Sequence, residues 1–284
     1  MTELVAPLPQ VGVVDIALAT SQAETRAATQ VLGEIWSQDG GPPLTPELAW
    51  ALLHAGNYVA VARCDDVVIG AAIAFRGYDD HGLHLHSHIA GLLPTHQGSK
   101  IGFALKQHQR QWALAQGIDR ITWTFDPLVA RNAYFNIVKL GTTIAGYYPD
   151  FYGPLDDDIN AGDESDRCLA SWQLDSERAV RAAAGELNAP TVAELRRRGA
   201  VGALVEGASG EPLIEGTGHL DGVPLLCQLP RDIVSLRASA PTLARQWRLA
   251  LRSVLAPTLY DGWQVDAVTR NGWLVLTPPS RAAR

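Results

Sequence analysis

Hydrophobic and polar positions alternate from residue 83 to residue 89, and this period of two is typical of a β-strand. One face of the expected strand carries three histidines, His84, His86 and His88. An apolar end follows, and the strand stops at Pro94. After a short polar loop, apolar residues recur with helical spacing from residue 101 to residue 115, which predicts an amphipathic helix with Lys106 on its polar face. The chain thus places a strand, a tight loop and a helix in direct succession.

Similar patterns predict an alternation of strands and helices around this stretch. Strands are expected at residues 11–17, 58–64, 67–76, 121–125, 144–151 and 167–174. Helices are expected after the capping residues Thr20 or Ser21, after Thr45, and at residues 131–140. Residues 67–76 follow a hairpin turn at Asp65-Asp66 and are apolar on both faces, so they should lie in the middle of a sheet. The order predicts an α+β fold with a mixed, mostly antiparallel central sheet flanked by helices.

The composition changes near residue 175, which predicts a smaller α+β region at the C-terminal end. A helix is expected at residues 176–187, a linker at 188–190, strands at 202–206, 212–215 and 224–229, a helix at 242–255, and a hairpin of 263–269 with 273–277. We therefore expect three parts: residues 1–174, a helix and linker at 175–190, and residues 191–284. Three interpretations of the last part are open: a degenerate second copy of the first part, a lid, or a structural extension that enlarges the core.

The loop between the histidine strand and the next helix has the features of an anion site. The first N–H groups of a helix have no partner within it, and the helix dipole places partial positive charge there. A diphosphate can accept hydrogen bonds from several of those donors. The loop contains neither the GxxxxGK[ST] pattern of a P-loop nor the GxGxxG pattern of a dinucleotide site. An ordinary strand–turn–helix corner is the alternative.

Charge and cysteine content exclude several other classes. The net charge of −7 argues against a nucleic-acid partner, which needs a basic face. The three cysteines, Cys64, Cys168 and Cys227, form no CxxC pair, so neither a disulfide framework nor a zinc ribbon is suggested. No run of about 18 apolar residues and no basic, apolar leader is seen, so we expect a cytoplasmic protein that does not bind membranes. The acidic run at residues 156–162 departs from the calcium-loop pattern and is read as a solvated loop.

The loop sequence resembles the pyrophosphate loop of the GNAT acyltransferase superfamily, [Gln/Arg]-x-x-Gly-x-[Gly/Ala]. The aligned residues are Gln97, Gly98, Ser99, Lys100, Ile101 and Gly102. Gln97 and Gly102 match, whereas Lys100 replaces the middle glycine and could either crowd a diphosphate or add charge to the site. Further short segments of the sequence resemble a subgroup of predicted GNAT acyltransferases of about this length. These segments are His86-Ser87-His88, Gly102-Phe103-Ala104-Leu105-Lys106, Trp123-Thr124-Phe125-Asp126-Pro127-Leu128, Asn132-Ala133, Lys139-Leu140-Gly141 and Leu243-Ala244-Arg245-Gln246-Trp247-Arg248.

This resemblance implies where an acyl-CoA would bind. The pantetheine would pair with backbone at the end of the histidine strand, at Gly91, Leu92 and Leu93, and the Leu93 N–H would be the main oxyanion donor. The diphosphate would lie on residues 97–102. Asn132 and Asn136 would bond the pantetheine amides, although helix capping or an exposed position on the helix explains them equally well.

Acyl transfer to an amine also needs a proton acceptor and a proton donor. Histidine has a suitable pKa, and His88 is nearest the expected thioester end, followed by His86. Many GNAT enzymes carry an acid Tyr where this chain has Ile137, so Tyr134 is a substitute candidate, with Tyr147 and Tyr148 as further ones. Asp126 would bind the acceptor's ammonium, orient a histidine, or simply begin a turn. A metal site at the three histidines is disfavoured, because no acidic residue or cysteine has suitable spacing.

The sequence therefore predicts an acyl-CoA-dependent N-acyltransferase without a metal. It would move an acetyl or succinyl group from acetyl-CoA or succinyl-CoA to the amine of a small molecule, an amino acid being one candidate, by direct attack in a ternary complex. The partners are acyl-CoA and the amine acceptor, and a homodimer is allowed for. The alternatives are a non-catalytic acyl-CoA sensor and a structural protein.

Overall fold

A computed structural model describes residues 14–36, 43–153, 163–216 and 222–279. The chain forms two compact units, which we describe separately. The first comprises Met1–Arg76 and Ser87–Trp112, and the second comprises Gly77–His86 and Ala113–Arg284. This partition passes through two strands, β3 (Val67–Asp79) and β4 (Gly82–Leu92). The three-part division expected from composition stays a prediction.

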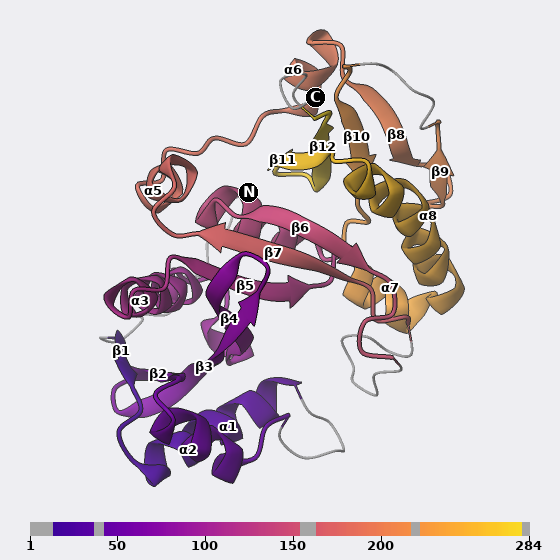
Figure 1. The fold of residues 1–284 in the computed structure, drawn as a ribbon. Coiled ribbons are helices and arrows are strands. Elements are labelled where there is room, and N and C mark those ends of the chain that lie inside the picture. The colour runs from indigo at the N-terminus through magenta and orange to yellow at the C-terminus, as the bar shows by residue number, and fades with distance from the viewer. Residues whose placement is uncertain (1–13, 37–42, 154–162, 217–221, 280–284) are drawn as a thin grey trace, which may run out of the picture. The chain divides into compact units, whose positions relative to one another are not determined.

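The first unit carries strands in the hydrogen-bonded order β1-β2-β3-β4, together with helices from the N-terminal half (Figure 1). The new elements are β1 (Val14–Leu18), α1 (Gln22–Trp36), α2 (Pro46–His54), β2 (Tyr58–Cys64) and α3 (Ile101–Ala115). The expected caps are confirmed. The Ser21 hydroxyl accepts the Glu24 N–H at 3.3 Å, and the Thr45 hydroxyl accepts the Leu48 N–H at 3.3 Å.

The turn between β2 and β3 is the expected hairpin. Asp65 and Asp66 have φ angles of 48° and 67°. Two successive left-handed residues are what a type I′ turn requires, and its twist matches that of the two strands. β3 then runs between β2 and β4 in the strand order, as its two apolar faces predicted.

Gly70 on β3 marks a close approach of two backbones. A Cβ at this position would lie 2.4 Å from a methyl carbon of Leu92 and 2.7 Å from the carbonyl oxygen of Gly91. The Leu93 N–H also donates to the Ile69 carbonyl at 2.9 Å, so β3 and the end of β4 are held together here. Glycine in a strand often marks such an approach.

We expect Gly70→Ala to lower the free energy of unfolding by about 1–3 kcal/mol, because a backbone oxygen cannot move aside as a side chain can. Gly102→Ala is the matched control. Its Cβ would meet the same Leu92 at an ordinary 3.7 Å, and alanine favours the helix there. Urea denaturation of both variants measures the difference. Equal stability of Gly70→Ala and wild type would show that the strands can move apart at no cost.

In the second unit, strands follow β4 in the order β4-β5-β7-β6. β5 (Arg120–Phe125) pairs parallel to β4 through Leu85 with Ile121 and His86 with Thr122. β7 (Arg167–Gln173) pairs antiparallel with both β5 and β6 (Thr143–Tyr148). Together with the antiparallel pairs of the first unit, these strands confirm the predicted α+β fold with a mostly antiparallel sheet and flanking helices.

The helix expected at residues 131–140 changes type along its length. It begins as α4 (Ala130–Tyr134) and continues as the wider π-helical turn η2 (Phe135–Leu140). Gly141 ends it with a φ of 75°, and both Gly141 and Thr142 donate their N–H groups to the Asn136 carbonyl. Such π turns are uncommon and often occur at functional sites.

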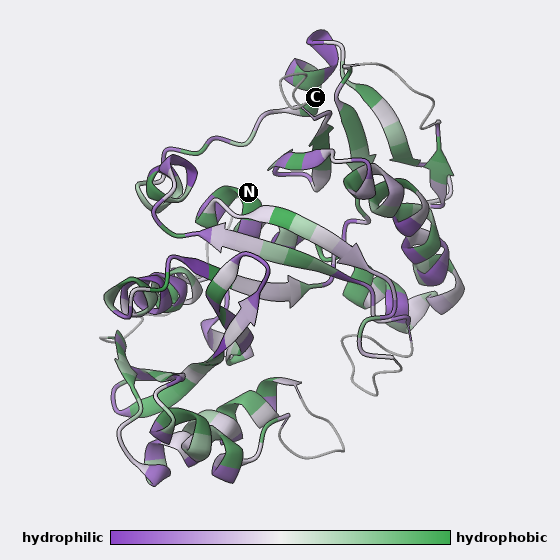
Figure 2. Ribbon diagram, viewed as in Figure 1, coloured by the Kyte–Doolittle hydropathy of each residue, from purple (hydrophilic) through white to green (hydrophobic). Residues whose placement is uncertain are grey.

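The rest of the second unit contains a five-stranded sheet in the order β11-β12-β10-β8-β9. Its strands are β8 (Val201–Glu206), β9 (Pro212–Ile214), β10 (Leu225–Gln228), β11 (Gln264–Val268) and β12 (Trp273–Thr277), and its helices are α5 (Glu177–Ala183), α6 (Val192–Arg197), α7 (Ile233–Ser239) and α8 (Pro241–Tyr260). Figure 2 shows that β8 and β10 are largely hydrophobic. The short helices α6 and α7 were not predicted, although Thr191 and Asp232 cap them as helix signals should.

Two predictions fall on residues that the structure does not describe: the start of the strand at 11–17 and the acidic run at 156–162. Among the described helices, none is long and apolar enough to cross a membrane.

Candidate functional site

The loop between β4 and α3 is shaped by its own side chains. A single turn of 3₁₀ helix, Pro94–His96, leaves the strand, and Gly98 takes a left-handed φ of 76°. The Gln97 amide donates back to the Leu92 carbonyl at 3.1 Å. The Ser99 hydroxyl donates to the His96 carbonyl at 2.6 Å. Gln97 and Ser99 therefore set the path of the loop.

The start of α3 presents backbone donors beside this loop. The first hydrogen bond along the helix runs from the Ala104 N–H to the Lys100 carbonyl. The N–H groups before it, from Ile101 to Phe103, have no partner within the helix, and the Ser99 hydroxyl lies 3.4 Å from the first of them. Lys100 is exposed, so an anion placed here would meet N–H groups, the positive helix end and an ammonium group.

The expected oxyanion donor needs correction. The Leu93 N–H donates to the Ile69 carbonyl at 2.9 Å, which keeps it in the contact between β3 and β4. It is therefore not available to an oxyanion. Of the other two residues expected to meet pantetheine, Leu92 is buried against Ile101, and Gly91 lies against the end of α1.

The three histidines of β4 have different surroundings. His84 lies near Asp79 and Arg120, with Nδ1 3.3 Å from the Arg120 guanidinium. His86 shares a hydrogen bond of 3.1 Å with the Thr122 hydroxyl. His88 has an exposed edge and lies against the Phe75 ring, and partial burial lowers its pKa. In the described part of the chain, no group of three His, Cys, Asp or Glu residues could hold a metal ion.

Lys106 was expected on the polar face of α3, but the structure buries it. Its ammonium group donates to the Ser87 hydroxyl at 2.8 Å and to the Gln109 amide oxygen at 3.1 Å. Burial lowers its pKa to about 7. Ser87 lies between His86 and His88 on β4, so a lysine that titrates near neutrality is held next to the histidine segment. The polar spacing of α3 gave no signal of this burial.

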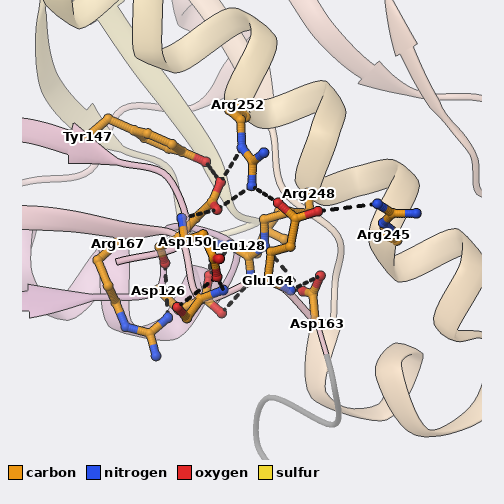
Figure 3. Close-up of polar contacts among 12 residues, drawn as sticks. Asp126, Leu128, Tyr147, Asp150, Asp163, Glu164, Arg167, Arg245, Arg248 and Arg252 are labelled. Atoms are coloured by element: carbon orange, nitrogen blue, oxygen red, sulfur yellow. Dashed lines mark hydrogen bonds and ion pairs between the residues drawn. The ribbon is translucent and has the colours of Figure 1, made fainter. Parts of the chain in front are cut away.

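Asp126, directly after β5, is held by Arg248 of α8 (Figure 3) and by Arg237 of α7. Its two oxygens each accept from Arg248 at 2.9 Å, one also accepts from Arg237, and the other accepts the Leu128 N–H at 2.9 Å. Burial alone would raise the pKa of Asp126, but Arg248 and Arg237 outweigh it and hold that pKa well below its usual range. These bonds favour a structural role at the β5–α4 turn, and the predicted catalytic role of Asp126 stays a prediction.

The same arginines bind carboxylates that precede β7. Asp163 accepts from Arg248 at 2.9 Å and from Arg237 at 3.1 Å, and these side chains are buried. Asp166 accepts from a third arginine, Arg252, and from the Tyr147 hydroxyl, while the Arg167 guanidinium donates to the Asp166 carbonyl. We call this set of contacts the arginine–carboxylate network. It joins helices α7 and α8 to the ends of β5 and β7.

The remaining predicted residues lie on α4 and its π-helical turn. Asn132 is exposed in the first turn, Tyr134 is half-buried, and Asn136 is buried at the start of η2. No finding tests their predicted contacts to pantetheine or their part in proton transfer. Ile137 is fully buried, so the position at which many GNAT enzymes carry an acid holds a core side chain here.

Part of this chain is similar to known acetyltransferases. Residues 24–136 match the model of the Acetyltransferase (GNAT) family. Among curated proteins, none matches this chain in sequence. A GNAT-family acetyltransferase from Streptococcus pneumoniae is similar in structure at 16% identity, with a TM-score of 0.45, over 56% of this chain and 97% of that chain. The yncA protein of Salmonella typhimurium, solved with its cofactor acetyl-CoA, is similar at 19% identity, with a TM-score of 0.48, over 64% and 99%. The ribosomal-protein-S18-alanine N-acetyltransferase of Escherichia coli is similar at 13% identity, with a TM-score of 0.47, over 58% and 96%.

Proposed function

We propose that this protein is an acyl-CoA-dependent N-acyltransferase acting on the amine of a small molecule, because residues 24–136 match the model of the Acetyltransferase (GNAT) family. The observation that carries the proposal is the loop of residues 97–100 leading into the first N–H groups of α3, which have no partner within the helix. That arrangement suits the diphosphate of CoA. Acetyl and succinyl groups are the acyl groups we propose, and an amino acid is the acceptor we would test first.

Direct attack by the amine fits the side chains that the structure describes. Burial raises the pKa of the Cys168 thiol and raises that of Cys227 to about 12, so neither is a ready thiolate nucleophile. His88 is our proposed general base, because its lowered pKa keeps the imidazole neutral and able to accept the proton of the attacking amine. His86 is the second candidate, and Tyr134 remains the proposed proton donor to the leaving thiolate.

Calorimetric titration with acetyl-CoA and succinyl-CoA, followed by thiol release with a panel of amino acids, tests the proposal. Binding of one donor, with free thiol appearing only when an amine is added, is the expected result. Binding without release against any amine would favour a non-catalytic acyl-CoA sensor, which the unusual Lys100 and the absent acid at Ile137 support. No binding of either donor would contradict the proposed diphosphate site. The cytoplasmic location and the homodimer stay predictions.

We expect Lys100→Met to weaken CoA binding about tenfold, since a charged hydrogen bond contributes about 1.5 kcal/mol. The Lys100 side chain is exposed at the start of α3, and methionine removes its charge while keeping its length. Lys139→Met is the control, because Lys139 is also exposed but lies on η2 in the second unit. Calorimetry with CoA measures both variants. Tighter binding by Lys100→Met would mean that the lysine repels or crowds the ligand.

A further inference from the structure

The indole N–H of Trp36 is a buried donor that has no partner among the described residues. Trp36 is the last residue of α1, and its Nε1 is enclosed while the ring packs on the core of the first unit. Leaving a buried donor without a hydrogen bond costs about 1–3 kcal/mol, so such groups are uncommon in folded proteins. An apolar ring would fill the same space without this cost. We therefore expect this buried N–H to have a function as a hydrogen-bond donor.

This donor lies beside Gly91 on β4. A Cβ at Gly91 would come 3.1 Å from Trp36 Nε1 and 3.1 Å from the Cδ1 of Ile35. Gly91 does not need its freedom for an unusual backbone angle, because its φ is not in the left-handed range. What glycine provides here is room: a larger residue would push the indole away from the strand. The sequence thus keeps the N–H close to the β4 backbone at this point.

The position matters because the pantetheine of acyl-CoA, with the thioester at its end, is predicted to lie at Gly91, Leu92 and Leu93. Attack by an amine turns the thioester carbonyl oxygen into an oxyanion, which needs a hydrogen-bond donor already in place. The Leu93 N–H cannot serve, because it is bonded to the Ile69 carbonyl. Trp36 Nε1 is a donor only and exchanges no proton with the reaction, which is the chemistry an oxyanion site requires.

We propose that the Nε1–H of Trp36 binds the thioester carbonyl oxygen of acyl-CoA and stabilises the oxyanion of the tetrahedral intermediate. The amine nitrogen attacks the carbonyl carbon, and the C=O electron pair moves onto the oxygen that Trp36 binds. The proton of the amine passes to His88. When the C=O bond reforms, the C–S bond breaks and the thiolate of CoA leaves and takes up a proton. This assignment rests on the proposed function and names a catalytic residue of the same site.

Trp36→Phe removes the N–H and keeps an aromatic ring. We expect kcat to fall about 100-fold, the usual cost of losing one oxyanion donor, while the dissociation constant of acetyl-CoA changes less than twofold. If Trp36 had only a structural role, its replacement would not lower kcat while leaving the affinity for acetyl-CoA unchanged. The matched control is Trp172→Phe, because the Trp172 Nε1 is also buried without a partner but belongs to β7 in the second unit. Its kcat should stay at the wild-type level.

A second replacement covers the case in which phenylalanine leaves too large a gap for folding. Benzothienylalanine at position 36 has sulfur in place of the N–H and nearly the same shape, and it should give the same loss of kcat. Folding of each variant is checked by circular dichroism and a thermal melt. A folded variant of either kind with wild-type kcat would overturn the inference, as would weaker acetyl-CoA binding with kcat unchanged. Absence of thiol release by the wild type would instead overturn the proposed function, and this inference with it.

Discussion

Replacing Arg248 by methionine should lower the free energy of unfolding by about 3–5 kcal/mol, the usual cost of breaking a buried ion pair from one side. The Arg248 side chain is completely buried and bonds both Asp126 and Asp163. Without it, the two buried carboxylates keep their bonds to Arg237 but lose one of their two bonded guanidinium groups. Urea denaturation at neutral pH measures the loss.

Two further variants show whether the loss comes from the buried charges. Arg245→Met is the matched control: it lies one turn earlier on α8, its side chain is 67% exposed and it reaches Glu164 at 3.4 Å, so we expect a change below about 0.5 kcal/mol. The double variant Asp126→Asn with Arg248→Met should recover part of the loss. Asparagine keeps an oxygen for the Leu128 N–H while removing one uncompensated charge. An Arg248→Met protein as stable as wild type would contradict a structural role of the arginine–carboxylate network.

Replacing Lys106 by methionine should raise the stability of the protein at pH 7 and flatten its pH dependence. The folded-state pKa of Lys106 is about 7, whereas its ordinary value is 10.5. Between these values the unfolded chain binds a proton that the folded chain does not, so wild-type stability should rise as pH rises from about 7 to about 10. Below pH 7 both states carry the proton, and the full cost of a buried charge remains. The shift corresponds to a cost on the order of 5 kcal/mol.

Chemical denaturation of wild type and Lys106→Met at pH 6.5, 8 and 9.5 separates this effect from other groups that titrate in the same range. The difference between the two proteins should be largest at the lowest pH and shrink toward the highest. Lys100→Met is a suitable control, because Lys100 is exposed and should leave the wild-type slope unchanged. Parallel curves for wild type and Lys106→Met would show that Lys106 does not lose its proton on folding.

Local patterns predicted most of the elements, because the interactions that fix them act over a few residues. The alternation of β4, the caps at Ser21 and Thr45, and the turn at Asp65-Asp66 all depend on neighbours within one turn or one strand. Short elements were harder to predict from the sequence. α6 and α7 have six and seven residues, too few for a period to appear, so their capping residues were the only usable signal.

The loop before α3 could also be foreseen from the sequence, since a strand, a glycine loop and a helix start follow one another in the chain. What the sequence could not supply is which donors are already used. Ile69 is on β3 and Leu93 directly follows β4, and only the approach of these two segments in the fold shows that the Leu93 N–H is occupied. The burial of Lys106 depends in the same way on Ser87, a residue of another element.

The sequence by itself determined the order of elements, the α+β class and the likeness to an acyl-CoA-binding family. Only the tertiary structure decided which charges are buried together. Asp126 and Arg248 are 122 positions apart, and nothing local to either residue identifies the other. Their meeting depends on how the β5–α4 turn and α8 pack within the second unit. Burial and partner choice are properties of the folded chain, because desolvation and hydrogen bonding depend on what surrounds a group in space and not on its neighbours in sequence.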